Sequence, residues 1–164
     1  MTREPKPAPA PEVLGLVHGG ITVSDMDASL AFYRDGLGLA VELDTVRDAT
    51  YQHVGLALPF TDIRMVVLVV PGTPAGRIEL LEYRGAARRP AGSEPCDPAS
   101  AHLCLEVRDA AATLERMTGR GYRSRSPSVV PIDAGANTGG WMVYLADPDG
   151  YWIELLQRPP ALTR

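Results

Sequence analysis

Two stretches of this chain alternate between apolar and polar residues, as a half-buried β-strand requires. Residues 17–23 carry apolar side chains or glycine at every second position, and His18 occupies an intervening position. Residues 102–107 alternate in the same way, and His102 opens that stretch. Because successive side chains of a strand point to opposite faces of its sheet, each histidine is predicted to lie opposite the apolar residues.

A helix is predicted after each of these strands. Apolar residues recur at helical spacing from Met26 to Leu37, Ser24 or Asp25 can cap the helix, and glycines follow it. Asp109 is the predicted cap of the corresponding helix in the second half. Three further strands are predicted in each half, near 50–58, 63–70 and 77–83 and then near 123–130, 142–146 and 151–157.

The two halves of the chain are repeats of one another. The run His-Gly-Gly-Ile-Thr-Val-Ser-Asp is echoed by His-Leu-Cys-Leu-Glu-Val-Arg-Asp, and Ile-Glu-Leu-Leu closes both halves. Because one four-stranded sheet has a concave face that needs a partner, both halves are expected to form a single α+β domain. Its predicted parts are module 1 (13–83), a linker (84–100) and module 2 (101–158), between a disordered proline-rich tail (1–12) and a second tail (159–164).

Charge and composition exclude several classes of protein. The net charge of −4 and the pI near 5.3 argue against nucleic-acid binding, which requires a clustered basic surface. No apolar run approaches the ~20 residues of a membrane span, and the N-terminus lacks a signal-peptide pattern, so a cytoplasmic protein is expected. Cys96 and Cys104 are too few for a disulfide scaffold or a zinc cluster and are interpreted as structural.

Four residues at equivalent positions of the two halves are candidate metal ligands. His18 and His102 lie opposite the apolar faces of their strands, as do Glu79 and Glu154 in the Ile-Glu-Leu-Leu repeats. A lone histidine or glutamate on a strand is more often structural or solvated, but the recurrence of both at matching positions favours a site. Two imidazoles and two carboxylates suit one divalent ion: Ni²⁺, Zn²⁺, Co²⁺, Fe²⁺ or Mn²⁺.

Other residues are weaker candidates for contacts with a small-molecule substrate. His53 has no counterpart in the second half, but the alternation around it could point it into the same cleft as the four ligands. Trp152 lies two residues before Glu154 in the same predicted strand, so both side chains are expected on the same face. The linker arginines could bind an anionic substrate, although a solvated linker explains them as well: Arg84, Arg88 and Arg89.

Two further motifs accompany the four candidate ligands: Ala-Phe-Tyr-Arg-Asp-Gly-Leu-Gly-Leu at 31–39 and Asp-Pro-Asp-Gly-Tyr-Trp-Ile-Glu-Leu at 147–155. Together these features resemble the vicinal oxygen chelate superfamily, which includes glyoxalase I, methylmalonyl-CoA epimerase, extradiol dioxygenases, and bleomycin and fosfomycin resistance proteins. The resemblance covers roughly residues 13–158. It implies two βαβββ modules that form a half-open eight-stranded barrel around a metal cleft.

The resemblance also implies an activity. The activity implied by the resemblance is that of a metal-dependent lyase or isomerase of the glyoxalase I type. In such an enzyme two oxygens of the substrate chelate the metal, and the resemblance implies that Glu154 or Glu79 shuttles a proton next to a carbonyl. In the related dioxygenases the position of Glu79 is normally not a ligand. The alternatives that stay open are an extradiol-type dioxygenase, a CoA-ester epimerase and a non-catalytic drug-binding resistance protein.

Members of this superfamily usually pair as homodimers, and some of them swap modules. A swap here would place His18 and Glu79 of one subunit opposite His102 and Glu154 of the other. The sequence is compatible with both the swapped and the unswapped dimer.

Overall fold

A computed structural model of the chain describes residues 13–48, 50–73, 76–89 and 94–160. The tail predicted at 1–12 and the end of the second predicted tail, 161–164, lie outside the described residues. The elements of the first half are β1 (Gly19–Thr22), α1 (Met26–Tyr33), β2 (Ala40–Arg47), α2 (Thr50–Leu56), β3 (Asp62–Val69) and β4 (Arg77–Arg84). Those of the second half are β5 (His102–Glu106), α3 (Ala110–Gly119), β6 (Val130–Pro131), β7 (Trp141–Ala146) and β8 (Trp152–Gln157).

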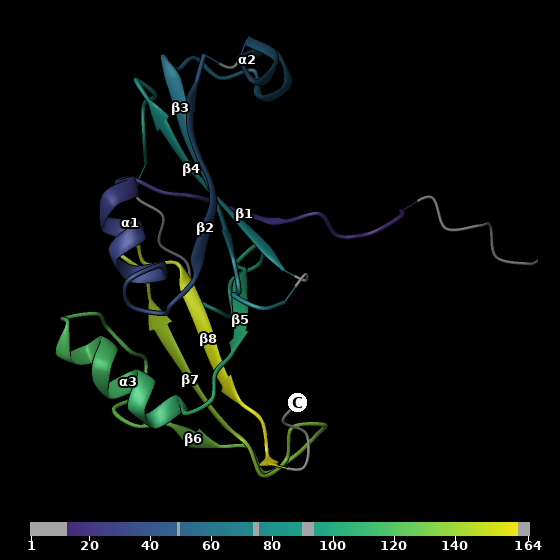
Figure 1. Ribbon diagram of the computed structural model, residues 1–164, viewed down its shortest axis with the longest axis vertical. Helices are drawn as coiled ribbons and strands as arrows, with labels where there is room; N and C mark the ends of the chain where they lie inside the picture. The colour runs from purple at the N-terminus through teal and green to yellow at the C-terminus, as the bar shows by residue number, and fades with distance from the viewer. Residues whose placement is uncertain (1–12, 49, 74–75, 90–93, 161–164) are drawn as a thin grey trace, which may run out of the picture.

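The two halves have the same topology, which confirms the predicted α+β fold built from a repeated module. Each forms a four-stranded sheet, in the order β1-β4-β3-β2 and β5-β8-β7-β6. In both sheets the first strand runs parallel to the last, and the other neighbours are antiparallel. Figure 1 shows the two sheets one above the other, and they do not close into a barrel.

The helices begin where the sequence predicts. The Asp25 carboxylate accepts hydrogen bonds from the backbone N–H groups of Asp27 and Ala28 at 2.9 and 3.0 Å, and so caps α1. Asp109 caps α3 in the same way, accepting from the N–H of Ala112 at 2.9 Å. Repetition of the cap fixes where each helix starts relative to the preceding strand.

The helix-covered faces of both sheets contribute to one apolar core. Helices α1 and α3 lie on the same side of the sheets (Figure 1), and Gly36, just after α1, lies against α3. A Cβ atom at Gly36 would come within 2.5 Å of the Phe32 backbone oxygen and within 2.8 Å of the Met117 side chain, so this position requires glycine. Buried side chains from both halves therefore form one cluster, which includes Leu30, Phe32, Val66, Leu80, Leu114, Leu145 and Leu155.

A buried hydrogen bond joins the two modules inside this core. The Tyr33 hydroxyl donates to a carboxylate oxygen of Asp147 at 2.8 Å, and both side chains are buried. Asp147 also accepts from the backbone N–H groups of Asp149 and Tyr151 at 3.0 and 2.8 Å. Burial, followed by the charge of Asp147, raises the pKa of Tyr33 well above its ordinary value, so this hydroxyl stays a donor.

The strand predicted near 50–58 is wrong. Residues Thr50–Leu56 form helix α2, and the first strand after α1 is β2, at Ala40–Arg47. Strand β2 lies at the edge of its sheet and carries charged residues that pair with β3 and β4, such as Asp44 with Arg64 and Glu42 with Arg77. Those charges interrupt the apolar pattern that identifies a strand.

The strand predicted near 123–130 is largely wrong as well. This stretch contains only an isolated bridge from Ser124 to Leu145 and the start of β6. The hydroxyls of Ser124 and Ser126 each donate at 2.7 Å to a backbone carbonyl two residues ahead. Such local bonds compete with a strand ladder, and Pro127 removes a backbone donor.

No helix in the described ranges is long and apolar enough to cross a membrane.

We predict that Tyr33→Phe lowers the free energy of unfolding by about 1–3 kcal/mol, because a buried carboxylate loses one of its donors. Urea denaturation measures this loss. Tyr122→Phe is a matched control, since the rings of Tyr33 and Tyr122 both make edge contacts with Phe32, at 4.9 and 4.8 Å. Equal effects of the two substitutions would show that the Tyr33–Asp147 bond contributes nothing beyond ring packing.

Candidate functional site

The first predicted pair of ligands comes together at the start of β1. His18 directly precedes the strand, and Glu79 on β4 lies beside Gly20 in the parallel register. The His18 Nε2 atom is 3.3 Å from Glu79 Oε2, and the two side chains are 42% and 17% exposed. Glu79 lies opposite the buried Ile78 and Leu80, as the alternation predicts.

The second pair repeats this geometry in module 2. His102 opens β5, and Glu154 on β8 lies beside Cys104 in the parallel register. The His102 Nε2 atom is 3.2 Å from Glu154 Oε2, and the side chains are 44% and 18% exposed. The repeat therefore produces two nearly identical His–Glu pairs.

The two pairs do not meet within one chain. Within the described ranges, no three or more His, Cys, Asp and Glu side chains are close enough to hold a metal ion. The expected single cleft lined by all four ligands is therefore not formed by one chain. The physical reason is that both sheets use their helix-covered faces for the shared core, so each pair stands on the free face of its own sheet.

Each pair nevertheless has the spacing of two ligands of one ion. Metal–nitrogen and metal–oxygen bonds of about 2.0–2.2 Å place two neighbouring ligands about 3 Å apart when the angle between them is near 90°. The observed 3.3 and 3.2 Å agree with that separation. Two donors are half of a stable site, so each pair is called a half-site here: His18 with Glu79, and His102 with Glu154.

Sequence reasoning missed one residue of the second half-site, Tyr144. Its hydroxyl donates to Glu154 Oε2 at 3.0 Å and lies 3.4 Å from His102 Nε2. Burial, then the hydrogen bond to Glu154 and its charge, raise the pKa of Tyr144 to about 12. Alternation with the buried Val143 and Leu145 was a signal that Tyr144 occupies the free face.

Cys104 also belongs to the surroundings of Glu154. The side chains packed around this thiol, then the charge of Glu154 and a hydrogen bond to it, raise the pKa of Cys104 to about 11. The thiol is therefore protonated at neutral pH and acts as a donor. Both cysteines are free and exposed, and Cys104 lies on the free face beside Glu154.

An apolar cluster covers the end of the free face in module 1. Phe60 and Ile63 are buried there, with Met65, Leu81 and Tyr83 packed against them. Tyr83 is near enough to Glu79 that, after burial, the charge of Glu79 contributes to raising its pKa. These residues form an apolar floor beside the first half-site.

The two predicted substrate contacts lie in different modules. His53 reaches the apolar floor from α2 instead of from a strand, and its ring stacks on Phe60 with 3.7 Å between centroids. Trp152 is the cross-strand neighbour of His102, and the Arg125 guanidinium lies 4.8 Å from its ring centroid. Their contacts with a substrate stay predictions.

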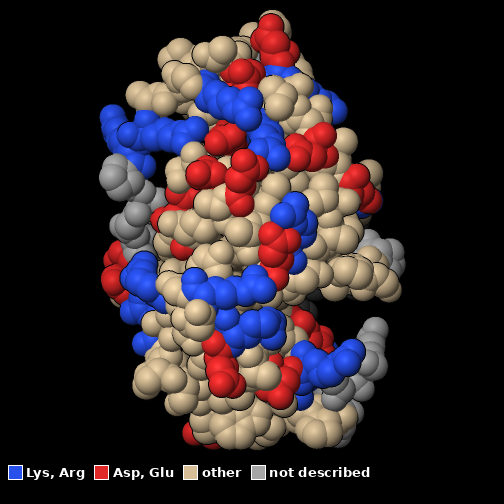
Figure 2. All heavy atoms as spheres, turned by 60° about the vertical axis from the view of Figure 1, so that its left-hand side comes forward, with Lys and Arg blue, Asp and Glu red and all other residues tan. Residues whose placement is uncertain are grey.

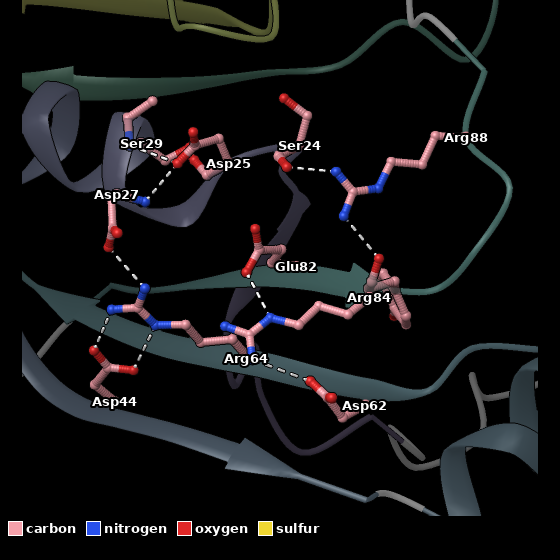
Figure 3. Close-up of polar contacts among 12 residues, drawn as sticks. Ser24, Asp25, Asp27, Ser29, Asp44, Asp62, Arg64, Glu82, Arg84 and Arg88 are labelled. Carbon is pink, nitrogen blue, oxygen red and sulfur yellow. Dashed lines mark hydrogen bonds and ion pairs between the residues drawn. The ribbon is translucent and has the colours of Figure 1, made fainter.

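Two of the three linker arginines bond to other parts of the fold (Figure 3). Arg84 pairs with Glu82 and Asp62 at 3.2 and 3.3 Å, and Arg88 donates to the backbone carbonyls of Ser24 and Tyr83. Glu82 lies on the opposite face of β4 from Glu79. Arg84 and Arg88 therefore stabilise the fold and do not line the half-site.

Arg64 stands on the same helix-covered face and completes this charged network. It binds both oxygens of Asp44 at 3.1 and 2.8 Å and Asp27 of α1 at 2.7 Å, as Figure 3 shows. On the face drawn in Figure 2, positive and negative side chains are interspersed. That face carries no extended basic surface of the kind that nucleic acids bind.

Comparisons with known proteins agree with this architecture. The family model described as "Glyoxalase/Bleomycin resistance protein/Dioxygenase superfamily" matches residues 15–155. A lactoylglutathione lyase of Haemophilus influenzae is 30% identical over 144 residues, which cover 87% of this chain and 91% of that protein. A 2-epi-5-epi-valiolone epimerase of an Actinomyces species is 26% identical, covering 91% of this chain and 82% of its own.

Solved structures share the fold. A glyoxalase family protein from Bacillus cereus superimposes with a TM-score of 0.75 at 17% identity, covering 91% of this chain and 97% of that one. The trypanothione-dependent glyoxalase I of Leishmania major superimposes with a TM-score of 0.55 at 28% identity, covering 85% and 84%. These likenesses extend across both modules.

Proposed function

Because the chain belongs to the Glyoxalase/Bleomycin resistance protein/Dioxygenase superfamily, we propose that it is a metal-dependent lyase or isomerase of the glyoxalase I type. The observation that carries this proposal is the pair of half-sites, each with a histidine and a glutamate at ligand spacing. A protein that only sequesters a drug does not need both carboxylates. Lactoylglutathione lyases among the relatives support the lyase, and Glu79 supports it over a dioxygenase.

We propose that the complete site forms between two copies of the chain. His18 and Glu79 of one copy and His102 and Glu154 of the other would hold one divalent ion (Ni²⁺, Zn²⁺, Co²⁺, Fe²⁺ or Mn²⁺), and these nitrogen and oxygen donors suit such ions. The separation of the two half-sites within one chain supports this dimer. When bound, the ion supplies a Lewis acid that stabilises negative charge on a substrate oxygen.

Exposed apolar residues give independent support for a partner copy. Leu14 and Leu16, just before His18, are 99% and 93% exposed. Further apolar side chains are exposed beside these leucines, on β2, on α2 and just after α2. The residues are Val13, Val17, Val41, Leu43, Val46, Tyr51, Val54, Leu56 and Leu58. The exposed leucines directly before His18 offer an apolar contact to a second copy next to the half-site.

The residues of the chain would then move a proton between adjacent carbons. The hemithioacetal of methylglyoxal with a thiol carries a hydroxyl and a carbonyl on neighbouring carbons. A glutamate carboxylate takes the proton from the carbon that bears sulfur and returns it to the former carbonyl carbon. The hydroxyl proton passes to the former carbonyl oxygen, which yields a 2-hydroxy thioester. The apolar floor binds the hydrocarbon part of the substrate and excludes water, with His53 stacked on its Phe60.

A second candidate is an epimerase, favoured by the 2-epi-5-epi-valiolone epimerase relative. Epimerisation next to a carbonyl also requires a carboxylate that removes a proton and a second group that returns it to the opposite face. The same half-sites serve either reaction, and the substrate distinguishes the two.

A mixed dimer tests where the site forms. We predict that the His18→Ala and His102→Ala homodimers each lose both metal ions, because every site lacks one histidine. A heterodimer of the two variants, purified through two different tags, regains one intact site, about half of the wild-type metal content, because a two-fold dimer has two equivalent sites. Elemental analysis measures this. A heterodimer without metal, or a monomeric wild type in sedimentation, contradicts the shared site.

Activity of the metal-loaded protein tests the lyase. We predict that methylglyoxal with a low-molecular-weight thiol is converted to the thioester, followed by its ultraviolet absorbance. Glu79→Gln and Glu154→Gln each lower kcat/KM by about 10²-fold or more, because each removes a ligand or the base. Glu82→Gln, on the same strand as Glu79 but on the other face, leaves kcat/KM unchanged. Oxygen-dependent cleavage of a catechol would instead support the dioxygenase. Ligand binding without turnover would support the sequestering protein.

A further inference from the structure

The carboxylates of the two half-sites have different neighbours. On the free face of module 1, Glu79 lies between Gly20 on β1 and Val67 on β3. Neither neighbour has a side chain that donates a hydrogen bond. In the second module, the same two positions beside Glu154 are occupied by Cys104 and Tyr144.

Burial does not distinguish the two carboxylates, but hydrogen bonding does. The Glu79 and Glu154 side chains are 17% and 18% exposed, and their histidines lie at 3.3 and 3.2 Å. Glu154 accepts from the Tyr144 hydroxyl at 3.0 Å, and Cys104 lies beside it in the parallel register. Within the described part of the chain, the structure places no such side-chain donor on Glu79 besides His18.

Tyr144 also contacts the other donor atom of its half-site. Its hydroxyl oxygen, His102 Nε2 and Glu154 Oε2 form a triangle with sides of 3.0, 3.2 and 3.4 Å. The His102 and Tyr144 rings meet edge to face, with 5.3 Å between centroids. One side chain therefore restrains both the imidazole and the carboxylate.

We propose that Tyr144, assisted by Cys104, is a positioning residue that holds His102 and Glu154 as the fixed ligands of the metal. Hydrogen bonds to ligating carboxylates preorganise them, and removing such a bond typically lowers metal affinity 10–100-fold. Glu79, without these donors, is then the carboxylate that leaves the ion and moves the proton. This inference rests on the proposed function, because it assigns different roles to two carboxylates of that same site.

Titration of the metal-free, full-length protein with Co²⁺ tests the inference without relying on turnover. We predict that Tyr144→Phe weakens Co²⁺ binding about 10-fold or more and alters the visible spectrum of the Co²⁺-loaded protein, which reports ligand arrangement. Tyr122→Phe removes a hydroxyl from module 2 away from Glu154 and leaves both readouts at wild-type values. Cys104→Ala gives a smaller loss of affinity in the same direction.

The two carboxylates provide a second test that does not depend on how Tyr144→Phe folds. We predict that Glu154→Gln weakens Co²⁺ binding more than Glu79→Gln does, and that Glu79→Gln keeps bound metal while kcat falls and KM changes little. Wild-type affinity and spectrum in Tyr144→Phe, or equal losses of affinity in the two glutamine variants, would overturn the inference. A wild-type protein that binds no Co²⁺ would instead refute the proposed metal site, and a metal-binding protein inactive on thiol adducts would refute only the lyase.

Discussion

The packing contact between the two modules determines on which faces of the sheets the histidines and glutamates of the half-sites can lie. Its centre is the Tyr33–Asp147 hydrogen bond, buried where the end of α1 meets the loop before β8. The same loop also accepts from the backbone N–H of Ser24 through Asp149, at 2.8 Å, just before α1 begins. One short segment, Asp147 to Gly150, therefore ties the start and the end of α1 to module 2, and it leads directly into the strand that carries Glu154.

The core that joins the two modules occupies the helix-covered face of each sheet. The apolar side chains that could have joined two sheets around one cleft are instead shared in the core behind them, so the two His–Glu pairs stand on separate free faces. A histidine that opens the first strand and a glutamate on the parallel neighbour then meet in each module, because parallel pairing sets them side by side. The architecture thus explains both why the half-sites are accurate copies and why one chain contains only halves.

The sequence predicted what depends on local pattern and repetition. The His–Glu pairs, the aspartate caps and the paired modules all follow from alternation and from the echo between the halves. Strand β2 was not predicted because its charged side chains are satisfied by Arg64 and Arg77 from strands distant in the sequence. The sequence did not predict that the half-sites are separate or that Tyr144 contacts Glu154. Both features depend on packing and strand register between distant segments, which local sequence patterns do not encode.

Differences between the two repeats allow their two glutamates to take different roles. Two identical half-sites would present equivalent carboxylates, each equally held and equally free to act as a base. A general base must be free to move toward its substrate, whereas a structural ligand gains from being fixed. Placing Tyr144 and Cys104 in module 2, where module 1 has Val67 and Gly20, satisfies both requirements without altering the ligands themselves. The apolar floor formed by Phe60 and Ile63 lies beside Glu79 and not beside Glu154, so the less restrained carboxylate is also the one next to the surface that would bind the hydrocarbon part of a substrate.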